Sequence, residues 1–161
     1  LRPVAARNIV DRMAEALVQQ GRRAHEDEEL PPAEPLAPRA QAVLIGDFLT
    51  DPADIAKTVQ AMASRGALGH VVMISDPIED TFPFSGHTEF LDVDSDARLR
   101  VGDARTFRDD YVRRLAAHRD RVREICAGVG WTFVLHRTDR PASEALLALR
   151  MRIEGAKGGP A

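Results

Sequence analysis

The stretch AVLIGD at residues 42–47 decides the fold, and two later stretches follow the same plan. Residues 71–76 read VVMISD, and residues 131–135 read WTFVL shortly before the chain reaches Asp139. Continuously apolar runs of this kind, each followed by helical sequence, are typical of parallel strands that are buried on both faces. In open parallel sheets, ligands bind beyond the carboxyl ends of the strands. We therefore expect an α/β fold with the aspartates that follow these strands at its functional edge.

Length and composition describe an ordinary soluble domain. The chain has 161 residues, of which 44% are hydrophobic and 29% are charged. Its formal net charge of −3 provides no general attraction to nucleic acid or to anionic membrane. No apolar run approaches the roughly 18 to 20 residues that span a bilayer.

Two further features concern the compartment and the extent of the chain. Cys126 is the only cysteine, which excludes an intramolecular disulfide and a cysteine-bound zinc ion. A single thiol fits a reducing compartment, so we expect a cytoplasmic protein. The chain begins at Leu1 and not at methionine, so we expect it to be part of a longer product.

The first half of the chain predicts a helix, a loop and a strand-helix-strand unit. An amphipathic helix is expected over residues 4–20, followed by an acidic, proline-rich surface loop over residues 25–39. Asp51 and Pro52 mark the start of the next helix, because aspartate caps helix N-termini and proline suits the first turn. That helix is expected to end near Gly66.

The second half of the chain contains an insertion and two more helices. Residues 77–103 predict a loop and a β-hairpin at the carboxyl edge of the sheet. The long helix that follows should bury one stripe, formed by Phe107, Tyr111, Leu115, Val122 and Cys126. The remaining segments are, in chain order, this helix over 104–127, a strand over 131–136, a helix over 140–153 and a flexible tail over 155–161.

Three parallel strands are too few for an open doubly wound sheet, which usually has about five or six. A long apolar strand at residues 42–46 would expose a row of unpaired backbone groups if it stood at an edge. We therefore expect its outer side to be covered by strands supplied upstream or by another chain. The second possibility includes self-association through residues 42–46.

Three motifs together carry a family resemblance. They are IGDFL at residues 45–49, PFSG at residues 83–86 and LHRTDRP at residues 135–141. In their order and spacing, the chain resembles the carboxyl half of the bacterial family called domain of unknown function fifty-eight. Members of this family resemble von Willebrand factor A domains. The resemblance covers residues 1–154, as the second half of one such domain.

The resemblance implies a Rossmann-like, von Willebrand factor A-like sheet in which the strands seen here are the fourth, fifth and sixth. The fourth strand would pair with a first strand that lies upstream of Leu1. In such domains the loop after strand one carries Asp-x-Ser-x-Ser, which holds Mg²⁺ together with a threonine and an aspartate after strand four. Asp47 occupies the strand-four position, but no Asp-x-Ser-x-Ser occurs in this sequence. The resemblance also implies a MoxR-type AAA+ ATPase as partner.

Asp47 is the candidate metal ligand. A carboxylate at the carboxyl end of a buried strand is a hard oxygen donor of the kind that Mg²⁺ prefers. The competing interpretation is that Asp47 caps its own turn or the following helix. One carboxylate with waters binds Mg²⁺ weakly, so the metal site of this chain is incomplete.

The other candidates are partner-binding residues, and each has a competing structural interpretation. Asp76 precedes a proline and would fix the strand exit, Asp139 or Thr138 would cap the last helix, and aromatic side chains in the insertion would pack over the sheet. The candidates are Asp76, His136, Arg137, Thr138, Asp139, Phe82 and Phe84.

Two functions remain open. The first is a non-catalytic interaction module that binds a partner protein through the crevice above its strands, with Mg²⁺ coupled to binding. The alternative is a Mg²⁺-dependent hydrolase that acts on a small phosphorylated substrate through Asp47 and Asp76. The alternative needs a nucleophile or base and an anion-binding loop, and the sequence contains no Walker loop and no Gly-x-Ser-x-Gly elbow.

Overall fold

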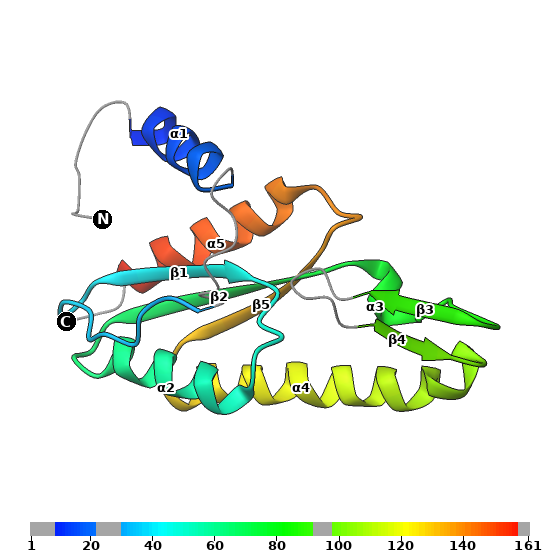
Figure 1. Ribbon diagram of the computed structural model, residues 1–161. Coiled ribbons are helices and arrows are strands. Elements are labelled where there is room, and N and C mark those ends of the chain that lie inside the picture. Colours follow the sequence, from blue (N-terminus) through cyan, green and yellow to red (C-terminus); the bar gives the residue numbers. More distant parts are fainter. Residues whose placement is uncertain (1–8, 22–29, 92–97, 158–161) are drawn as a thin grey trace.

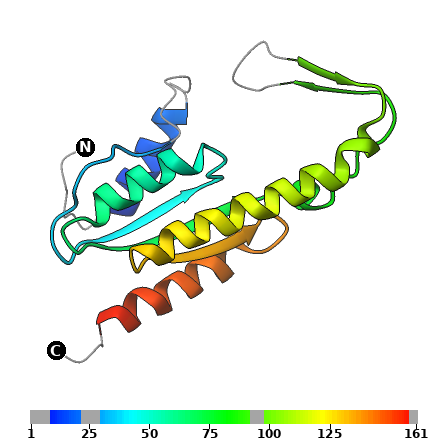
Figure 2. The same ribbon diagram turned by 90° about the horizontal axis from the view of Figure 1, so that it is seen from below.

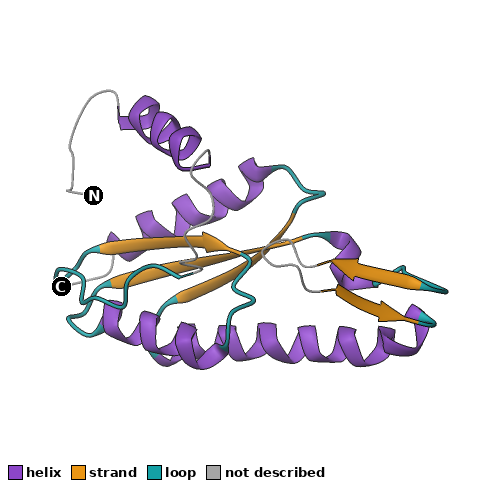
Figure 3. Cartoon of the chain, in the orientation of Figure 1, coloured by secondary structure: helices purple, strands orange, loops and turns teal. Residues whose placement is uncertain are grey.

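A three-stranded parallel sheet forms the centre of the molecule. The computed structural model describes residues 9–21, 30–91 and 98–157. The sheet consists of β1 (Gln41–Gly46), β2 (Leu68–Ser75) and β5 (Thr132–Arg137) in the order β1-β2-β5 (Figures 1 and 3). Val72 lies beside Ile45 on one side and Val134 on the other. The α/β fold class and the three parallel strands are confirmed.

Helices cover both faces of this sheet (Figures 1 and 2). The crossover helices α2 (Pro52–Ala63) and α4 (Arg108–Gly128) lie on one face and contact each other, whereas α5 (Ala142–Lys157) lies on the other. Both crossovers step across the sheet in the same direction, from β1 to β2 and from β2 to β5. Because parallel crossovers are right-handed, two steps in one direction put both helices on the same face.

The hydrophobic core lies between the sheet and the α2–α4 layer. Ile55 and Val59 of α2 are each 1% exposed, so this helix buries one apolar stripe. They pack with strand and α4 residues in one cluster, whose buried members are Phe48, Ile55, Val59, Met62, Val71, Met73, Val122, Cys126 and Trp131. The central strand β2 is buried along most of its length because it has a neighbour on each side and a layer on each face.

The opposite face of β1 is partly exposed in the described structure. Val43 and Ile45 point to the α5 side of the sheet, where α5 contacts β5, and Ile45 is 62% exposed. Within the described residues, β1 hydrogen bonds only to β2. The expected cover, by strands supplied upstream or by another chain, would lie outside the described residues, so that expectation stays a prediction.

The proline-rich segment before β1 is a loop, as predicted, from residue 30 where its description begins. It is attached to the core, because Leu30 and Leu36 pack against the buried cluster. The Leu36 N–H donates to the carbonyl of Met62 at 3.3 Å, which ties the loop to the end of α2.

The insertion after β2 contains one helix that the sequence interpretation missed. The five-residue α3 (Pro77–Thr81) precedes the predicted hairpin, which is formed by β3 (Thr88–Leu91) and β4 (Arg98–Val101). The hairpin extends away from the sheet beside the start of α4 (Figure 2). Residues 92–97, between its strands, lie outside the described residues.

Three predicted helix details are wrong. The long helix opens with a separate 3-10 turn, η1 (Ala104–Phe107), so Phe107 leaves the inward stripe and is 50% exposed. The helix α5 begins at Ala142, directly after Pro141, so neither Thr138 nor Asp139 stands at its cap position. It continues to Lys157, which places residues 155–157 in the helix and not in a tail.

The first helix is α1 (Ile9–Gly21), which confirms the helix predicted over residues 4–20 from residue 9 onward. Residues 4–8 lie outside the described residues. None of the described helices combines the length and the apolar character needed to cross a bilayer.

A close contact between Gly69 and Trp131 fixes β2 against the start of β5. The Trp131 indole is 4% exposed and donates from Nε1 to the carbonyl of Ala67 at 3.0 Å. A Cβ atom at Gly69 would lie 2.0 Å from the indole ring. Real Cβ atoms do not approach so closely, so only glycine fits at this position.

We predict that Gly69→Ala destabilises the fold, because the ring and the strand must separate to admit one methyl group. The expected loss is about 2–3 kcal/mol in the free energy of unfolding, measured by urea denaturation. Gly128→Ala is the matched control, since a Cβ atom there meets nothing within 4 Å. Equal stability of the two variants would contradict the role of the contact.

His70 is a buried titratable side chain on the α5 face of β2. It is 4% exposed, its Nδ1 bonds to the hydroxyl of Thr132 at 2.8 Å, and its Nε2 has no partner within the described chain. Burial, followed by the charge of Arg152, lowers the pKa of His70 from its ordinary value of 6.5. The folded protein therefore holds a neutral imidazole at pH 7.

We predict that stability decreases as the pH falls below about 6.5 because the unfolded chain then binds a proton at His70 that the folded chain does not. Urea denaturation at pH 7.0 and 5.5 should show this loss in the parent protein and a smaller loss in His70→Gln. The control is His87→Gln, which replaces an exposed histidine. If His70→Gln keeps the full pH dependence of the parent, the assignment is wrong.

Candidate functional site

Asp47 lies at the carboxyl end of β1 and is exposed. Its Oδ1 accepts a long hydrogen bond of 3.4 Å from the backbone N–H of Leu49. The following helix is capped by Asp51, whose Oδ1 accepts from Ala53 N–H at 2.8 Å. Asp47 is therefore not needed as the helix cap, and its carboxylate is held weakly by its own turn.

The turn beneath Asp47 is fixed by its neighbour Phe48. This side chain is 6% exposed and belongs to the core cluster, and its backbone adopts a left-handed conformation with φ of 49°. A residue with a Cβ atom adopts this conformation only at a cost of about 1–2 kcal/mol, so the surroundings must enforce it. The Phe48 carbonyl accepts a hydrogen bond of 2.6 Å from Nε2 of His118 on α4. Core packing and His118 together hold Asp47 at the rim.

Asp76 lies at the end of β2 and has a structural role, as the structural interpretation predicts. Its Oδ1 accepts from Ile78 N–H at 2.9 Å and so caps α3, and its Oδ2 accepts from the Thr138 hydroxyl at 2.8 Å. These hydrogen bonds, the one from Ile78 first, lower the pKa of Asp76. Thr138 is engaged by the same contact, so the ends of β2 and β5 are joined.

The end of β5 carries the remaining polar candidates. Arg137 forms two hydrogen bonds to the carboxylate of Asp139, of 3.1 and 2.9 Å, in a side-by-side arrangement. Its Nε also lies 3.9 Å from Asp80 of α3. His136 is half-buried within β5. Arg137 and Asp139 therefore compensate each other's charge.

A nearly buried arginine joins α4 to the end of β2. The side chain of Arg119 is 12% exposed, and its Nη1 lies 2.5 Å from Asp80 Oδ1. It also donates to the Ser75 hydroxyl and lies 3.7 Å from Glu79. Ser75 donates in turn to Glu79 at 3.1 Å. This cluster, which we call the Arg119 clamp, fixes the position of α3 at the carboxyl edge.

Phe82 and Phe84 lie at the base of the hairpin, in a second cluster. Phe82 is 7% exposed, and its ring centre lies 5.1 Å from that of Phe84, 5.8 Å from Phe90 and 4.7 Å from Tyr111. The packing interpretation accounts for these side chains. The aromatic cluster connects the hairpin to α4.

The structure thus joins some candidates and separates others. Asp76 and Thr138 lie together, as do Arg137 and Asp139, whereas Asp47 lies on the separate strand β1. Among the described residues there is no group of three or more His, Cys, Asp or Glu side chains that could hold a metal ion. Asp47 therefore supplies at most one ligand of such a site in this part of the chain.

Comparison with known proteins supports the family resemblance. The chain matches the family model described as protein of unknown function DUF58 over residues 3–121. The chain belongs to the DUF58 family. A search of curated proteins found no match, and a search of solved structures found none. The match ends within α4 and does not include β5. The position of β5 beside β2 in this DUF58 chain is therefore shown by their parallel pairing alone.

Sequence reasoning missed two positioning residues of this DUF58 chain, His118 and Arg119. Both lie on α4, where arginines and acids alternate along a mostly solvated helix. No spacing in the sequence distinguishes these two from their exposed neighbours. The helix α3, which was also missed, could have been predicted from the sequence. Asp76-Pro77 repeats the N-cap aspartate and first-turn proline of Asp51-Pro52.

We predict that Arg119→Leu destabilises the DUF58 chain by about 2 kcal/mol, because Asp80 and Glu79 lose their charged partner while partly buried. Arg121→Leu is the control, since Arg121 pairs with Glu124 at the surface and its loss should cost less than about 1 kcal/mol. Thermal and urea unfolding measure both. A cost for Arg119→Leu no larger than the control would contradict a structural role for the clamp.

Proposed function

We propose that this chain is a non-catalytic protein-interaction module, with its binding crevice beside the carboxyl end of β1. The direction of the two crossovers carries this proposal. In doubly wound sheets, the ligand crevice forms where the strand order reverses, because the helices on its two sides then lie on opposite faces. From β1 the chain steps only one way, to β2 and then to β5, so a reversal can lie only on the open side of β1.

Asp47 is the acid that this crevice would use. It lies next to the open side of β1, it is exposed, and the bond to its own turn is long. Asp76 and Asp139, by contrast, are held by Ile78, Thr138 and Arg137. Asp47 would therefore provide one oxygen ligand to Mg²⁺, and the other ligands would come from outside the described residues. This role agrees with the von Willebrand factor A-like character that the resemblance implies.

The partner would complete the metal site. In sites of this kind the partner supplies a carboxylate to the metal, so that Mg²⁺ and partner bind together. The resemblance makes a MoxR-type AAA+ ATPase the proposed partner. The open edge of β1, which pairs only with β2 among the described strands, would be paired by a further strand on the other side of the crevice.

The hydrolase alternative gains no support from the geometry. It needs a second acid that is free to act, and Asp76 has both carboxylate oxygens engaged. Asp47 and Asp76 also follow different strands, β1 and β2.

We predict that Asp47→Asn weakens Mg²⁺-dependent capture of the MoxR-type ATPase at least about tenfold, because an amide cannot supply the charge that the cation requires. The measurement is binding of the purified ATPase to the immobilised protein at its full natural length, in Mg²⁺ and in EDTA. The parent protein should lose binding in EDTA to the level of the variant.

The matched control is Glu124→Gln, which neutralises an exposed acid near the end of α4, at the opposite edge of the sheet from Asp47. It should bind as the parent does. Binding by Asp47→Asn that remains strong and still depends on Mg²⁺ would contradict the proposed role of Asp47. If the protein binds the ATPase equally well in Mg²⁺ and in EDTA, the proposed role of Mg²⁺ in binding is wrong.

A further inference from the structure

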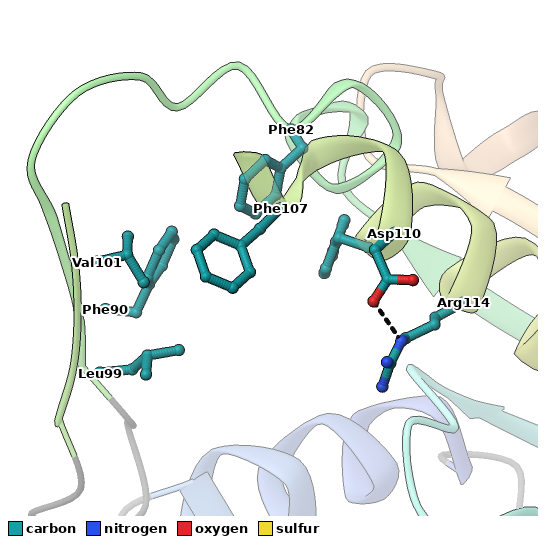
Figure 4. A pocket seen from close by; sticks show the side chains of 8 residues that line it. Phe82, Phe90, Leu99, Val101, Phe107, Asp110 and Arg114 are labelled. Carbon is teal, nitrogen blue, oxygen red and sulfur yellow. Dashed lines mark ion pairs between the residues drawn. The ribbon is translucent and has the colours of Figure 1, made fainter. Parts of the chain in front are cut away.

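An apolar groove lies between the hairpin and the start of α4 (Figure 4). It has a volume of about 450 Å³ and is lined on the hairpin side by Phe90, Leu99 and Val101. Phe107 and Tyr111 line the opposite side. In Figure 4 the Phe107 ring points across the groove towards the hairpin. A groove of this size and lining is typical of a binding site.

The groove is open in the described structure. Leu99 is 59% exposed and Phe107 is 50% exposed, although both belong to apolar surfaces that face one another. A two-stranded hairpin is marginally stable unless a helix or a further strand packs on its apolar face. The aromatic cluster covers only the base of this hairpin, so its outer part lacks the layer that it needs.

The same chain carries an amphipathic helix, α1, and every side chain of it that the structure describes is exposed. In α1 the apolar residues Val10, Met13 and Val18 follow helical spacing, and they are 74%, 59% and 59% exposed. Amphipathic helices bind apolar grooves through side chains at this spacing. In both views α1 lies well away from the hairpin (Figures 1 and 2), so it does not fill the groove of its own chain.

The charges beside the two surfaces are complementary. Asp110 and Arg114 line the groove, and the single carboxylate of Asp110 is shared by the guanidinium groups of Arg114 and of Arg113 beside it, so this group of three side chains carries one net positive charge. In α1, Asp11 and Glu15 are four residues apart, so they lie on one flank of the apolar stripe. An acidic flank beside a basic rim would orient the helix in the groove.

We propose that α1 of a second copy of this chain packs in the groove between the hairpin and α4. The apolar stripe of α1 then covers Leu99 and Phe107, and its acidic flank faces Arg113 and Arg114. The symmetrical exchange of two helices would join two copies through a pair of identical contacts. This surface is separate from the crevice beside β1, so the two proposals stand or fall independently.

Cysteine cross-linking tests the contact directly. One chain carries Met13→Cys and the other carries Leu99→Cys, both at exposed positions. The native Cys126 does not interfere, because it is fully buried and burial raises the pKa of its thiol to about 11. Docked cysteines have a high effective concentration, so mild oxidation of the mixed chains should give at least about tenfold more covalent dimer than the control pair.

The control pair combines Met13→Cys with Leu147→Cys, because Leu147 is equally exposed, at 61%, but lies on α5. Equal dimer in the two mixtures would overturn the proposal. A chain carrying both Met13→Cys and Leu99→Cys distinguishes the source of the helix. If it closes a disulfide within itself while the mixed pair does not cross-link, the helix comes from the same chain and the second-copy proposal is wrong.

A charge exchange provides the second test. Arg113→Glu with Arg114→Glu should raise the dissociation constant of the dimer about tenfold, measured by analytical ultracentrifugation. Adding Asp11→Lys and Glu15→Lys to the same chain should restore it to near the parent value. All four positions are exposed, so circular dichroism should show an unchanged fold. Failure of the second pair to restore the dimer, or a parent protein that is monomeric at all concentrations, would overturn the proposal.

Discussion

The burial of β2 on both faces and along both edges is the constraint on which the rest of the structure depends. A strand with two parallel neighbours must be reached and left by crossovers, and the right-handed rule then puts α2 and α4 on one face. Their apolar stripes close the core against β2, and the indole of Trp131 packs on Gly69 at its start. The three strands therefore end at one edge, where all the candidate polar residues gather.

At that edge, the polar residues divide into two kinds. Those after β2 and β5 stabilise the fold, because Arg119 binds Asp80, Asp76 caps α3 and Arg137 pairs with Asp139. Asp47 after β1 is different, since Phe48 and His118 hold its turn while its carboxylate faces solvent. The chain thus fixes the position of an acid that its own fold does not require, beside the open edge of β1.

Much of this fold could be predicted from local sequence, because continuous apolar runs and an Asp-Pro pair specify buried strands and a capped helix. The same Asp-Pro signal at Asp76 was available and would have found α3. Phe107 could not be placed correctly from helical spacing, since a 3-10 turn changes the phase just before α4. Arg119 and His118 could not be found at all, because their partners are 39 to 70 residues away in the sequence. Contacts of that kind become visible only when the sheet edge is assembled.

The most direct test of a metal site at Asp47 is a crystal structure of the protein at its full natural length, grown with Mn²⁺ in place of Mg²⁺ and measured at the manganese absorption edge. We expect an anomalous peak about 2.1–2.2 Å from a carboxylate oxygen of Asp47, with a further strand paired to the open edge of β1. A structure in which Mn²⁺ binds elsewhere, or in which the edge of β1 remains open to solvent beside an Asp47 without metal, would contradict it.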